Sequence, residues 1–228
     1  MAIAFFDFDR TLIAANSAVL WLRSELRLGH ISPFKALAAM VWVARYHLGF
    51  AGRGEGLKHA IASLAGSSET EFRERTIAFY ERKVRGLYRP GARRALDEHR
   101  ARGDRLVLLT STSFYLAELV ARDLQLDAVL CNRFEVDAGG LYTGRPLGDV
   151  CYGEGKLLHA ERYARSASVS LSECAFYTDS FADLPVMAAV GRPVAVNPDG
   201  RLRRIALSRH WEIVDWGEPS PAQLLTAG

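Results

Sequence analysis

The stretch AIAFFDFDRTLIA, residues 2–14, places two aspartates one residue apart directly after a run of apolar side chains. The apolar run, Ile3 to Phe6, is short and bounded by polar residues, which is typical of a strand buried on both faces. Carboxylates at the end of such a strand are costly to bury without a partner, and two like charges disfavour each other's ionised form. A divalent cation held between them removes that cost, so Asp7 and Asp9 are candidate metal-binding and catalytic residues.

The rest of the chain, from residue 90 onward, alternates between strand-like and helix-like runs. Such alternation is typical of a parallel sheet with helices on both faces, so the sequence predicts an α/β fold with a Rossmann-like core. The pair Gly139-Gly140 predicts a hairpin turn between two short strand-like runs. The expected strands are 105–109, 128–131, 174–178, 193–196 and 212–214, and the expected helices are 92–103, 114–124, 154–165, 182–190 and 201–208.

Residues 14–88 differ from this pattern because they have helical periodicity almost throughout. Four helices are expected there, within the segments NSAVLWLRSELRLG, SPFKALAAMVWVARYHLG, GLKHAIASLAG and SSETEFRERTIAFYERKV. A turn signal at Pro90-Gly91 returns the chain to the α/β pattern. The sequence therefore predicts an α/β catalytic core of residues 1–13 and 89–228, with an all-helical cap domain of residues 14–88 inserted after the first strand.

The composition is that of an ordinary globular protein, with 49% hydrophobic and 24% charged residues among 228 and a formal net charge of +3. No block of like charges resembles an arm that binds nucleic acid, so no nucleic-acid partner is expected. The most apolar segment, residues 34–50, is interrupted by Lys35 and Arg45. A membrane-spanning helix needs roughly 20 apolar residues, so no transmembrane segment is expected. Nothing in the sequence indicates an oligomeric state.

The N-terminal segment lacks the basic region that opens a signal peptide, and its apolar run is short. The three cysteines, Cys131, Cys151 and Cys174, are odd in number and form no CxxC motif. This pattern disfavours a disulfide framework or a zinc site and favours reduced thiols. Reduced thiols are typical of cytosolic proteins, so we expect a cytoplasmic location.

Polar side chains follow several of the expected strands. The strand RLVLL is followed by Thr110 and Ser111, and the strand CAFYT is followed by Asp179, with Asp183 four residues further on. Lys156 lies at the start of a helix in the sequence GEGK. Ligands of parallel α/β sheets bind beyond the carboxyl ends of the strands, so we expect these side chains to converge at one edge of the sheet.

This set of side chains suits the hydrolysis of a phosphate monoester. Repulsion opposes the attack of a carboxylate on a phosphate dianion, and a divalent cation bound by carboxylates offsets it. Lysine and hydroxyl or amide donors stabilise the charge on the transferring oxygens. A second carboxyl group protonates the leaving alkoxide and then deprotonates the water that splits the acyl-phosphate. Asp7, Asp9, Thr110, Lys156 and Asp179 supply each of these parts once.

Four motifs in this order resemble those of the haloacid dehalogenase superfamily: DFDRTL, the strand that ends in Thr110, Lys156, and DSFAD. The similarity covers essentially the whole chain. The helical insertion directly after the first motif resembles the cap of the phosphoserine-phosphatase-like branch, subfamily IB. The resemblance implies a Mg²⁺-dependent phosphatase with a helical cap that opens and closes over the site.

The resemblance also implies a role for each acidic residue of the motifs. Asp7 would be the nucleophile that forms an aspartyl-phosphate, and it would bind Mg²⁺ together with Asp179. Asp9 would be the general acid and base, with its backbone carbonyl on the metal. Dehalogenases of the superfamily lack the second carboxylate of the first motif, so the presence of Asp9 indicates phosphate chemistry.

The remaining implied roles concern the phosphate and the support of the site. Thr110 and the amide of Ser111 would hold the phosphate, and Lys156 would bridge the phosphate and the nucleophile. Asp183 would act from behind, holding metal-bound water or the lysine. Thr11 would brace the loop after the first strand.

The substrate is less well defined by the sequence. Phosphoserine phosphatases carry a glutamate five residues after the threonine of the first motif, where it meets the substrate ammonium, and here that position is Asn16. Loss of a buried counter-charge disfavours a cationic substrate, so phosphoserine is not the expected substrate. The apolar residues of segment 34–50 favour a small organic phosphate with an apolar portion, such as a lipid phosphate.

Two other functions are compatible with the same residues. A phosphotransferase or mutase would pass the phosphoryl group to a second alcohol instead of water, and only analysis of the products separates it from a hydrolase. A non-catalytic phosphate-binding protein is expected to lack one of the catalytic residues, and none is missing from this sequence.

Overall fold

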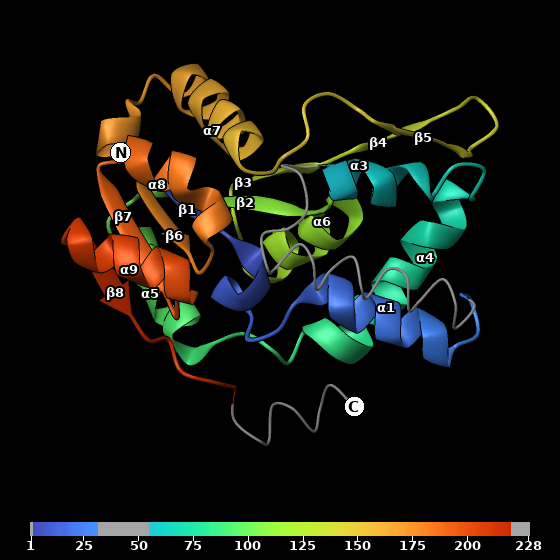
Figure 1. Cartoon of the computed structure of the whole chain (residues 1–228), viewed down its shortest axis with the longest axis horizontal. Coiled ribbons are helices and arrows are strands. Elements are labelled where there is room, and N and C mark those ends of the chain that lie inside the picture. The colour runs from blue at the N-terminus through green and yellow to red at the C-terminus, as the bar shows by residue number, and fades with distance from the viewer. Residues whose placement is uncertain (1, 32–54, 220–228) are drawn as a thin grey trace.

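The computed structural model describes residues 2–31 and 55–219, and its centre is a six-stranded sheet (Figure 1). The strands lie in the order β3-β2-β1-β6-β7-β8, and every neighbouring pair is parallel. Each strand predicted from the sequence is present, which confirms the α/β fold class. The strands are β1 (Ile3–Phe6), β2 (Arg105–Ser113), β3 (Ala128–Asn132), β6 (Ala175–Thr178), β7 (Arg192–Val196) and β8 (Glu212–Val214).

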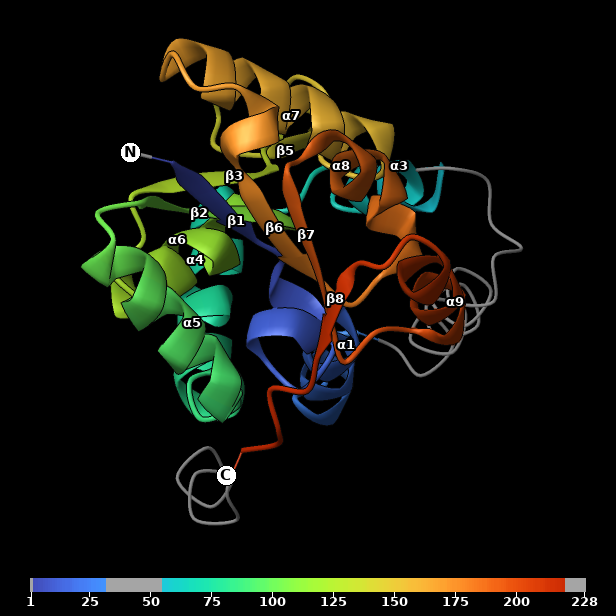
Figure 2. The same cartoon turned by 90° about the vertical axis from the view of Figure 1, so that its left-hand side faces the viewer.

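Helices cover both faces of this sheet (Figure 2). Along β1, Ala4 and Phe6 pack into one apolar core, whereas Ile3 and Phe5 pack into a second core on the opposite face. Side chains alternate across a strand, so a strand covered on both faces is apolar without interruption. The first core packs against α5 (Pro90–Ala101) and α6 (Phe114–Asp123), and the second against α7 (Glu154–Ser166), α8 (Leu184–Ala189) and α9 (Gly200–Ser208).

A helical segment follows β1, as the sequence predicts. A single wide turn, η1 (Phe8–Leu12), is followed by α1 (Ser17–Arg27), α3 (Glu55–Ala62) and α4 (Glu69–Phe79), which continues into a further turn, η2 (Tyr80–Val84). The helix expected within residues 32–49 lies outside the described residues. Where the chain leaves and re-enters the sheet region, Ile13 and Tyr88 form an antiparallel bridge. The two connecting segments therefore lie side by side.

The predicted hairpin is also present, and it contacts the helical segment. Strands β4 (Phe134–Val136) and β5 (Tyr142–Pro146) pair in antiparallel orientation. Gly140 has a φ of +78°, a conformation that glycine adopts without strain. The backbone of Tyr142 exchanges hydrogen bonds with the loop after α3, accepting from the Gly66 amide (2.9 Å) and donating to the Ser67 carbonyl (3.0 Å). The hairpin, which follows β3 in the chain, thus contacts the helical segment through its backbone.

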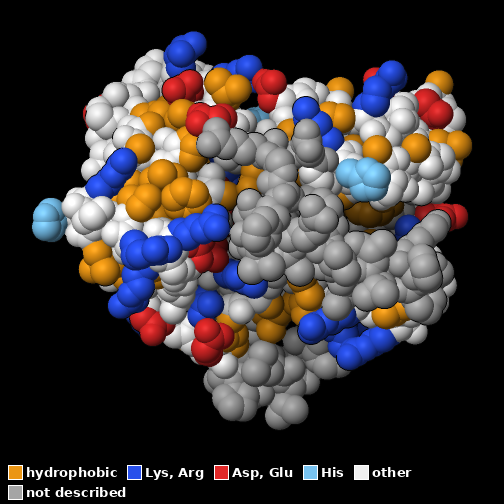
Figure 3. Space-filling model, in the orientation of Figure 1, with side chains coloured by type: hydrophobic (Ala, Val, Ile, Leu, Met, Phe, Trp, Pro, Cys, Tyr) orange, Lys and Arg blue, Asp and Glu red, His pale blue; other side chains and the backbone are white. Residues whose placement is uncertain are grey.

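No helix among the described residues is long and apolar enough to cross a membrane. On the described part of the face seen in Figure 3, basic side chains lie beside acidic ones. The three cysteines are free and buried. The absence of disulfide bonds among them agrees with the expectation from their number and spacing.

Candidate active site

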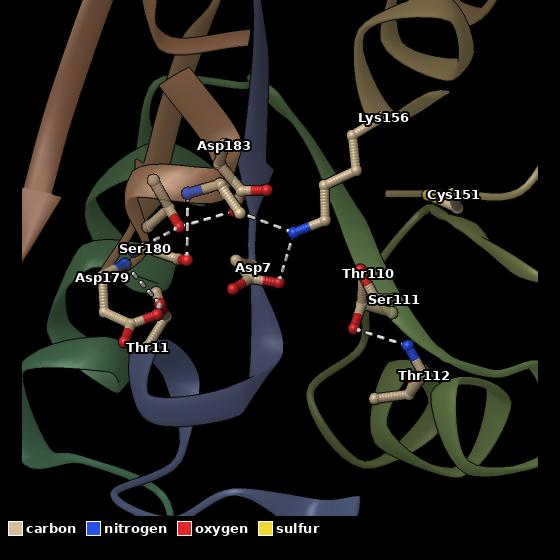
Figure 4. A network of polar contacts seen from close by, with 12 residues as sticks. Asp7, Thr11, Thr110, Ser111, Thr112, Cys151, Lys156, Asp179, Ser180 and Asp183 are labelled. Atoms are coloured by element: carbon tan, nitrogen blue, oxygen red, sulfur yellow. Dashed lines mark hydrogen bonds and ion pairs between the residues drawn. The ribbon is translucent and has the colours of Figure 1, made fainter. Parts of the chain in front are cut away.

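The predicted site residues meet at the carboxyl edge of the sheet. Asp7 follows β1, Thr110 lies near the end of β2, and Asp179 follows β6. These three strands are neighbours in the sheet, with β1 between β2 and β6. Figure 4 shows the side chains around Asp7 in one group, although they come from distant parts of the chain. The expectation that they converge at one edge is therefore confirmed.

Lys156 lies between two carboxylates. Its Nζ donates hydrogen bonds to Oδ1 of Asp7 and to Oδ2 of Asp183, each at 2.8 Å (Figure 4). The hydroxyl of Thr178 donates to the same Oδ2 of Asp183 at 2.7 Å. Lys156 and Asp183 are each only 2% exposed. Charge-assisted hydrogen bonds to two carboxylates thus hold the buried ammonium of Lys156 in place.

The backbone before Lys156 requires glycine at two positions. Gly153 precedes α7 with a φ of +53°, in the left-handed region that disfavours other residues. At Gly155, an added Cβ would lie 1.9 Å from the carbonyl oxygen of Val150. The GEGK sequence therefore allows the chain to turn sharply and to present the lysine in the first turn of the helix.

Asp179 is held by the turn that follows β1. Its backbone amide donates to Oγ1 of Thr11 at 3.0 Å, and the Thr11 hydroxyl lies 3.4 Å from Oδ1 of Asp179. Thr11 is fully buried. Among the described residues, no basic side chain forms an ion pair with Asp179, because Lys156 binds Asp7 and Asp183 instead.

The pKa values of the site reflect that Lys156 pairs with Asp7 and Asp183 but not with Asp179. Burial raises the pKa of Asp7 to about 7, although Lys156 opposes the shift. Burial also raises the pKa of Asp179 well above its usual range, and the charges of Asp7 and Asp183 add to the effect. Burial by itself disfavours the charged form of Lys156, but Asp183 and Asp7 raise its pKa so that it stays an ammonium. The charges of Arg10 and Lys156 oppose the shift at Asp179, but Lys156 forms its ion pairs with Asp7 and Asp183.

This excess of negative charge fits a divalent cation. Two buried carboxylates, on Asp7 and Asp179, supply oxygen ligands, which Mg²⁺ prefers. A cation there would give Asp179 the direct ion pair that it does not form with any basic side chain of the described residues. The residues of this site therefore fit Mg²⁺.

The carboxylate of Asp9 is bound to the start of α1. Its Oδ1 accepts a hydrogen bond from the Ser17 amide at 2.7 Å. Burial raises the pKa of Asp9, and the bond from Ser17 lowers it. The chain turns between these residues through Arg10, whose φ of +57° lies in the left-handed region and whose carbonyl accepts from Nε of Arg89 at 3.2 Å.

Asn16, the predicted specificity position, caps the same helix. Its Oδ1 accepts a hydrogen bond from the amide of Val19 at 3.0 Å. This is the arrangement of an N-cap, which satisfies one of the free amides of the first helical turn. The side-chain oxygen of Asn16 is therefore already engaged.

The predicted phosphate-binding residues lie in the last part of β2, where its pairing with β3 is irregular. Oγ1 of Thr110 accepts from the amide of Thr112 at 3.2 Å. The carbonyl of Ser111 accepts from Nδ2 of Asn132 at 2.7 Å. These two bonds fix the orientation of the peptide between Ser111 and Thr112.

Three residues in contact with the site were not identified from the sequence: Thr178, Asn132 and Asp199. Asp199 supports the loop of Asp179, since its amide donates to the Asp179 carbonyl at 2.8 Å and its Oδ2 accepts from the Phe181 amide at 2.7 Å. Thr178 and Asn132 end strands, and Asp199 follows one closely. The rule that polar residues at strand ends serve the site would have found them.

Comparisons with known proteins show the family to which the chain belongs. The chain matches the haloacid dehalogenase-like hydrolase family over residues 4–188. It is 32% identical to a phosphoserine phosphatase of Mycobacterium tuberculosis over 241 aligned residues, covering 100% of this chain and 78% of the relative. It is 27% identical to a histidinol-phosphatase of Neisseria meningitidis over 218 residues, covering 94% of this chain and 98% of the relative.

Solved structures have the same fold. A protein of unknown function from Bordetella pertussis Tohama I matches with a TM-score of 0.85 and 28% identity, covering 94% of this chain and 98% of that one. A substrate-bound phosphoserine phosphatase complex matches with a TM-score of 0.68 and 17% identity, covering 89% of each chain. At that identity the likeness shows the fold alone.

The family match and the relatives named as phosphatases identify the chain as a hydrolase of the phosphatase type. The chain belongs to the haloacid dehalogenase-like hydrolase family, since the family match covers residues 4–188 of 228.

Proposed function

We propose that this phosphatase is a Mg²⁺-dependent phosphomonoester hydrolase that acts through an aspartyl-phosphate on Asp7. The observation that carries the proposal is the unequal pairing of the buried charges. Lys156 binds both Asp7 and Asp183 at 2.8 Å, and Asp179 forms no ion pair with a basic side chain of the described residues. A buried carboxylate without a cation is costly, so the arrangement is best satisfied when a metal ion is bound.

The bonding of Asp7 suits a nucleophile. Its Oδ1 accepts from Lys156, and its backbone amide donates to the Tyr177 carbonyl at 2.9 Å. In the proposed reaction a carboxylate oxygen of Asp7 attacks the phosphorus, and the bond from phosphorus to the substrate alkoxide breaks. Thr110, the Ser111 amide and Lys156 bind the transferring phosphoryl oxygens. The carboxylates of Asp7 and Asp179 and the carbonyl of Asp9 would hold Mg²⁺, and the bound ion would neutralise charge on the phosphate.

Asp9 moves the protons in both halves of the reaction. The Ser17 amide binds only one of its carboxylate oxygens, Oδ1. Asp9 first gives a proton to the leaving alkoxide. It then takes a proton from the water that attacks the phosphorus of the aspartyl-phosphate, which releases inorganic phosphate and restores the Asp7 carboxylate. Asp183 and Thr11 support Lys156 and Asp179 from behind.

The division into a core of residues 1–13 and 89–228 and a cap of residues 14–88 is part of this proposal. The pairing of Ile13 with Tyr88 supports it, because both connecting segments cross at one place. A pair of adjacent connections is a suitable hinge for a cap that opens and closes.

For the substrate, we infer a small organic phosphate other than phosphoserine. Relatives are named for phosphoserine and for histidinol phosphate. In this chain, however, Asn16 carries no charge for a substrate ammonium, and its oxygen caps α1. The apolar residues of the segment 34–50 are the reason to include esters with an apolar portion.

The first test is release of inorganic phosphate from a panel of phosphomonoesters by the wild type and by Asp7→Asn. The panel includes O-phosphoserine, histidinol phosphate and alkyl phosphates of increasing chain length, each with Mg²⁺ or EDTA. We expect Mg²⁺-dependent release that falls by at least about 10³-fold in Asp7→Asn, because loss of a nucleophile removes the covalent route.

Two outcomes would change the proposal. Full activity of folded Asp7→Asn would refute the nucleophile assignment. Formation of a new phosphate ester when a second alcohol is added, in place of inorganic phosphate, would identify a phosphotransferase with the same site.

A further inference from the structure

We propose that Asn132 is a positioning residue that fixes two backbone segments relative to each other. One is the end of β2 that carries the proposed phosphate ligands, and the other is the segment at Cys151 that leads to Lys156. The inference rests on the proposed function, because it concerns the same phosphate site. Asn132 is the last residue of β3 and is 2% exposed. Its Nδ2 donates to the Ser111 carbonyl at 2.7 Å, and its Oδ1 accepts from the Cys151 amide at 2.9 Å.

The first contact acts on the last residues of β2. The Ser111 carbonyl belongs to the same peptide unit as the Thr112 amide, which donates to Oγ1 of Thr110 at 3.2 Å. Asn132 therefore binds one end of this peptide unit while Thr110 binds the other. The orientation of this peptide therefore helps to set the position of the Thr110 hydroxyl, which is one of the proposed phosphate ligands.

The second contact acts on the segment that leads to Lys156. Cys151 is fully buried, and its thiol lies 3.6 Å from the carbonyl of Leu130 in β3. Two residues later Gly153 directly precedes α7, and its carbonyl accepts from the Lys156 amide at 3.0 Å. The bond to Asn132 thus fixes the segment from which the lysine projects toward Asp7.

Only a carboxamide of this length satisfies both contacts. A carbonyl requires a donor and an amide requires an acceptor, and asparagine supplies one of each on a short side chain. Aspartate has no donor for the Ser111 carbonyl, and alanine leaves both buried backbone groups without a partner. Since Thr110 and Lys156 approach the phosphate from different strands and helices, one amide that bridges their supports sets the distance between them.

The chain contains a matched control for a bridging asparagine. Asn197 follows β7, donates from Nδ2 to Oδ1 of Asp215 at 2.6 Å and accepts at Oδ1 from the Trp216 amide at 3.0 Å. It also joins two chain segments at the carboxyl edge, but its side-chain bonds reach none of the site residues. Substitutions at Asn197 therefore remove the same kinds of bond without the proposed effect on the phosphate.

The experiment compares Asn132→Ala and Asn132→Asp with Asn197→Ala and Asn197→Asp. For each purified full-length protein we would measure thermal unfolding with and without Mg²⁺, and the affinity for inorganic phosphate by calorimetry in the presence of Mg²⁺. We expect both Asn132 variants to bind inorganic phosphate about tenfold more weakly than the wild type. The rise in unfolding temperature caused by Mg²⁺ should be retained, because Asp7 and Asp179 do not contact Asn132. The Asn197 variants should keep wild-type phosphate affinity.

Several results would overturn the proposal. Wild-type phosphate affinity in Asn132→Ala, or an equal loss in the Asn197 variants, would reduce Asn132 to a structural role. A loss in Asn132→Asp alone would indicate repulsion by the new charge instead of positioning. Should Asn132→Ala fail to fold, Asn132→Ser is measured in the same way, because its hydroxyl can replace one of the two bonds. Phosphate binding is measured without turnover, so a failure of the proposed reaction would be visible separately as absent hydrolysis by the wild type.

Discussion

At the scale of single residues, the site depends on how the ammonium of Lys156 is shared between two carboxylates. Lys156 bonds to Asp7 and Asp183 at equal distances of 2.8 Å, although Asp7 lies 149 positions away in the sequence. Thr178 binds the same oxygen of Asp183. Asp183 therefore serves to hold the lysine in place, and the lysine in turn holds Asp7.

Asp183→Asn tests this arrangement. The amide lacks the charge that pairs with Lys156, so the lysine should be less firmly held and kcat should fall roughly 10- to 100-fold, as for other supporting residues of metal sites. Steady-state kinetics with saturating Mg²⁺ would measure the change. The matched control is Asp149→Asn, since Asp149 forms an exposed ion pair with Arg162 and pairs with neither Lys156 nor Asp183 in the way that these two pair with each other. An unchanged kcat in folded Asp183→Asn would contradict the supporting role.

At the scale of elements, the first helix of the cap segment contributes a backbone group to the site. The amide of Ser17, the first residue of α1, binds Asp9 at 2.7 Å. Asn16 ends the preceding loop in an extended conformation and caps the helix. The start of α1 and the proposed general acid are therefore placed by the same few residues.

Ser17→Pro tests the amide without breaking the helix. Proline has no amide hydrogen, is well tolerated at the first helical position and follows an extended residue without strain. We expect kcat to fall about tenfold or more, with a greater loss for alkyl phosphates than for p-nitrophenyl phosphate, because nitrophenolate leaves without a proton. Ser17→Ala is the control, since it keeps the amide and removes only the hydroxyl. An equal loss of kcat for alkyl phosphates and for p-nitrophenyl phosphate would show that the Ser17 amide does not act on proton transfer.

At the scale of the whole molecule, buried polar groups join the layers of the fold. His99 of α5 is buried. Its Nε2 lies 2.8 Å from the hydroxyl of Tyr177 in β6, and its Nδ1 lies 2.8 Å from Oδ2 of Asp104. Burial lowers the pKa of His99 below the ordinary value of 6.5, although Asp104 opposes the shift. The folded protein therefore keeps this imidazole neutral at a pH at which the unfolded chain takes up a proton.

The consequence is a loss of stability in acid. Below about pH 6.5 the unfolded state binds more protons at His99 than the folded state, so the free energy of unfolding should decrease as the pH falls. Urea unfolding of the wild type and of His99→Gln across this range would measure the slope. The glutamine variant should be less stable at neutral pH but lose less stability on acidification. Identical slopes for the two proteins would show that His99 does not contribute.

Much of the fold could be predicted from the sequence because its signals are local. A strand covered on both faces must be apolar at consecutive positions, and a helix must repeat its apolar residues every three or four positions. The predicted strands accordingly agree with the structure to within a few residues, apart from β2, which extends to Ser113. Likewise, Asp7, Lys156 and Asp179 stand at strand ends or a helix start, and the topology of a parallel sheet brings such positions together.

The sequence by itself determined the order of strands and helices along the chain, the motifs at their ends and hence the kind of chemistry. Only the tertiary structure decided which partners those motif residues have. The bond of Asp9 to the Ser17 amide, the bridge of Asn132 between Ser111 and Cys151, and the contact of the β4–β5 hairpin with the loop after α3 all involve backbone atoms. Nearly every residue has the same backbone donor and acceptor, so the side-chain pattern does not predict which backbone groups form these bonds. The packing of the folded chain decides it.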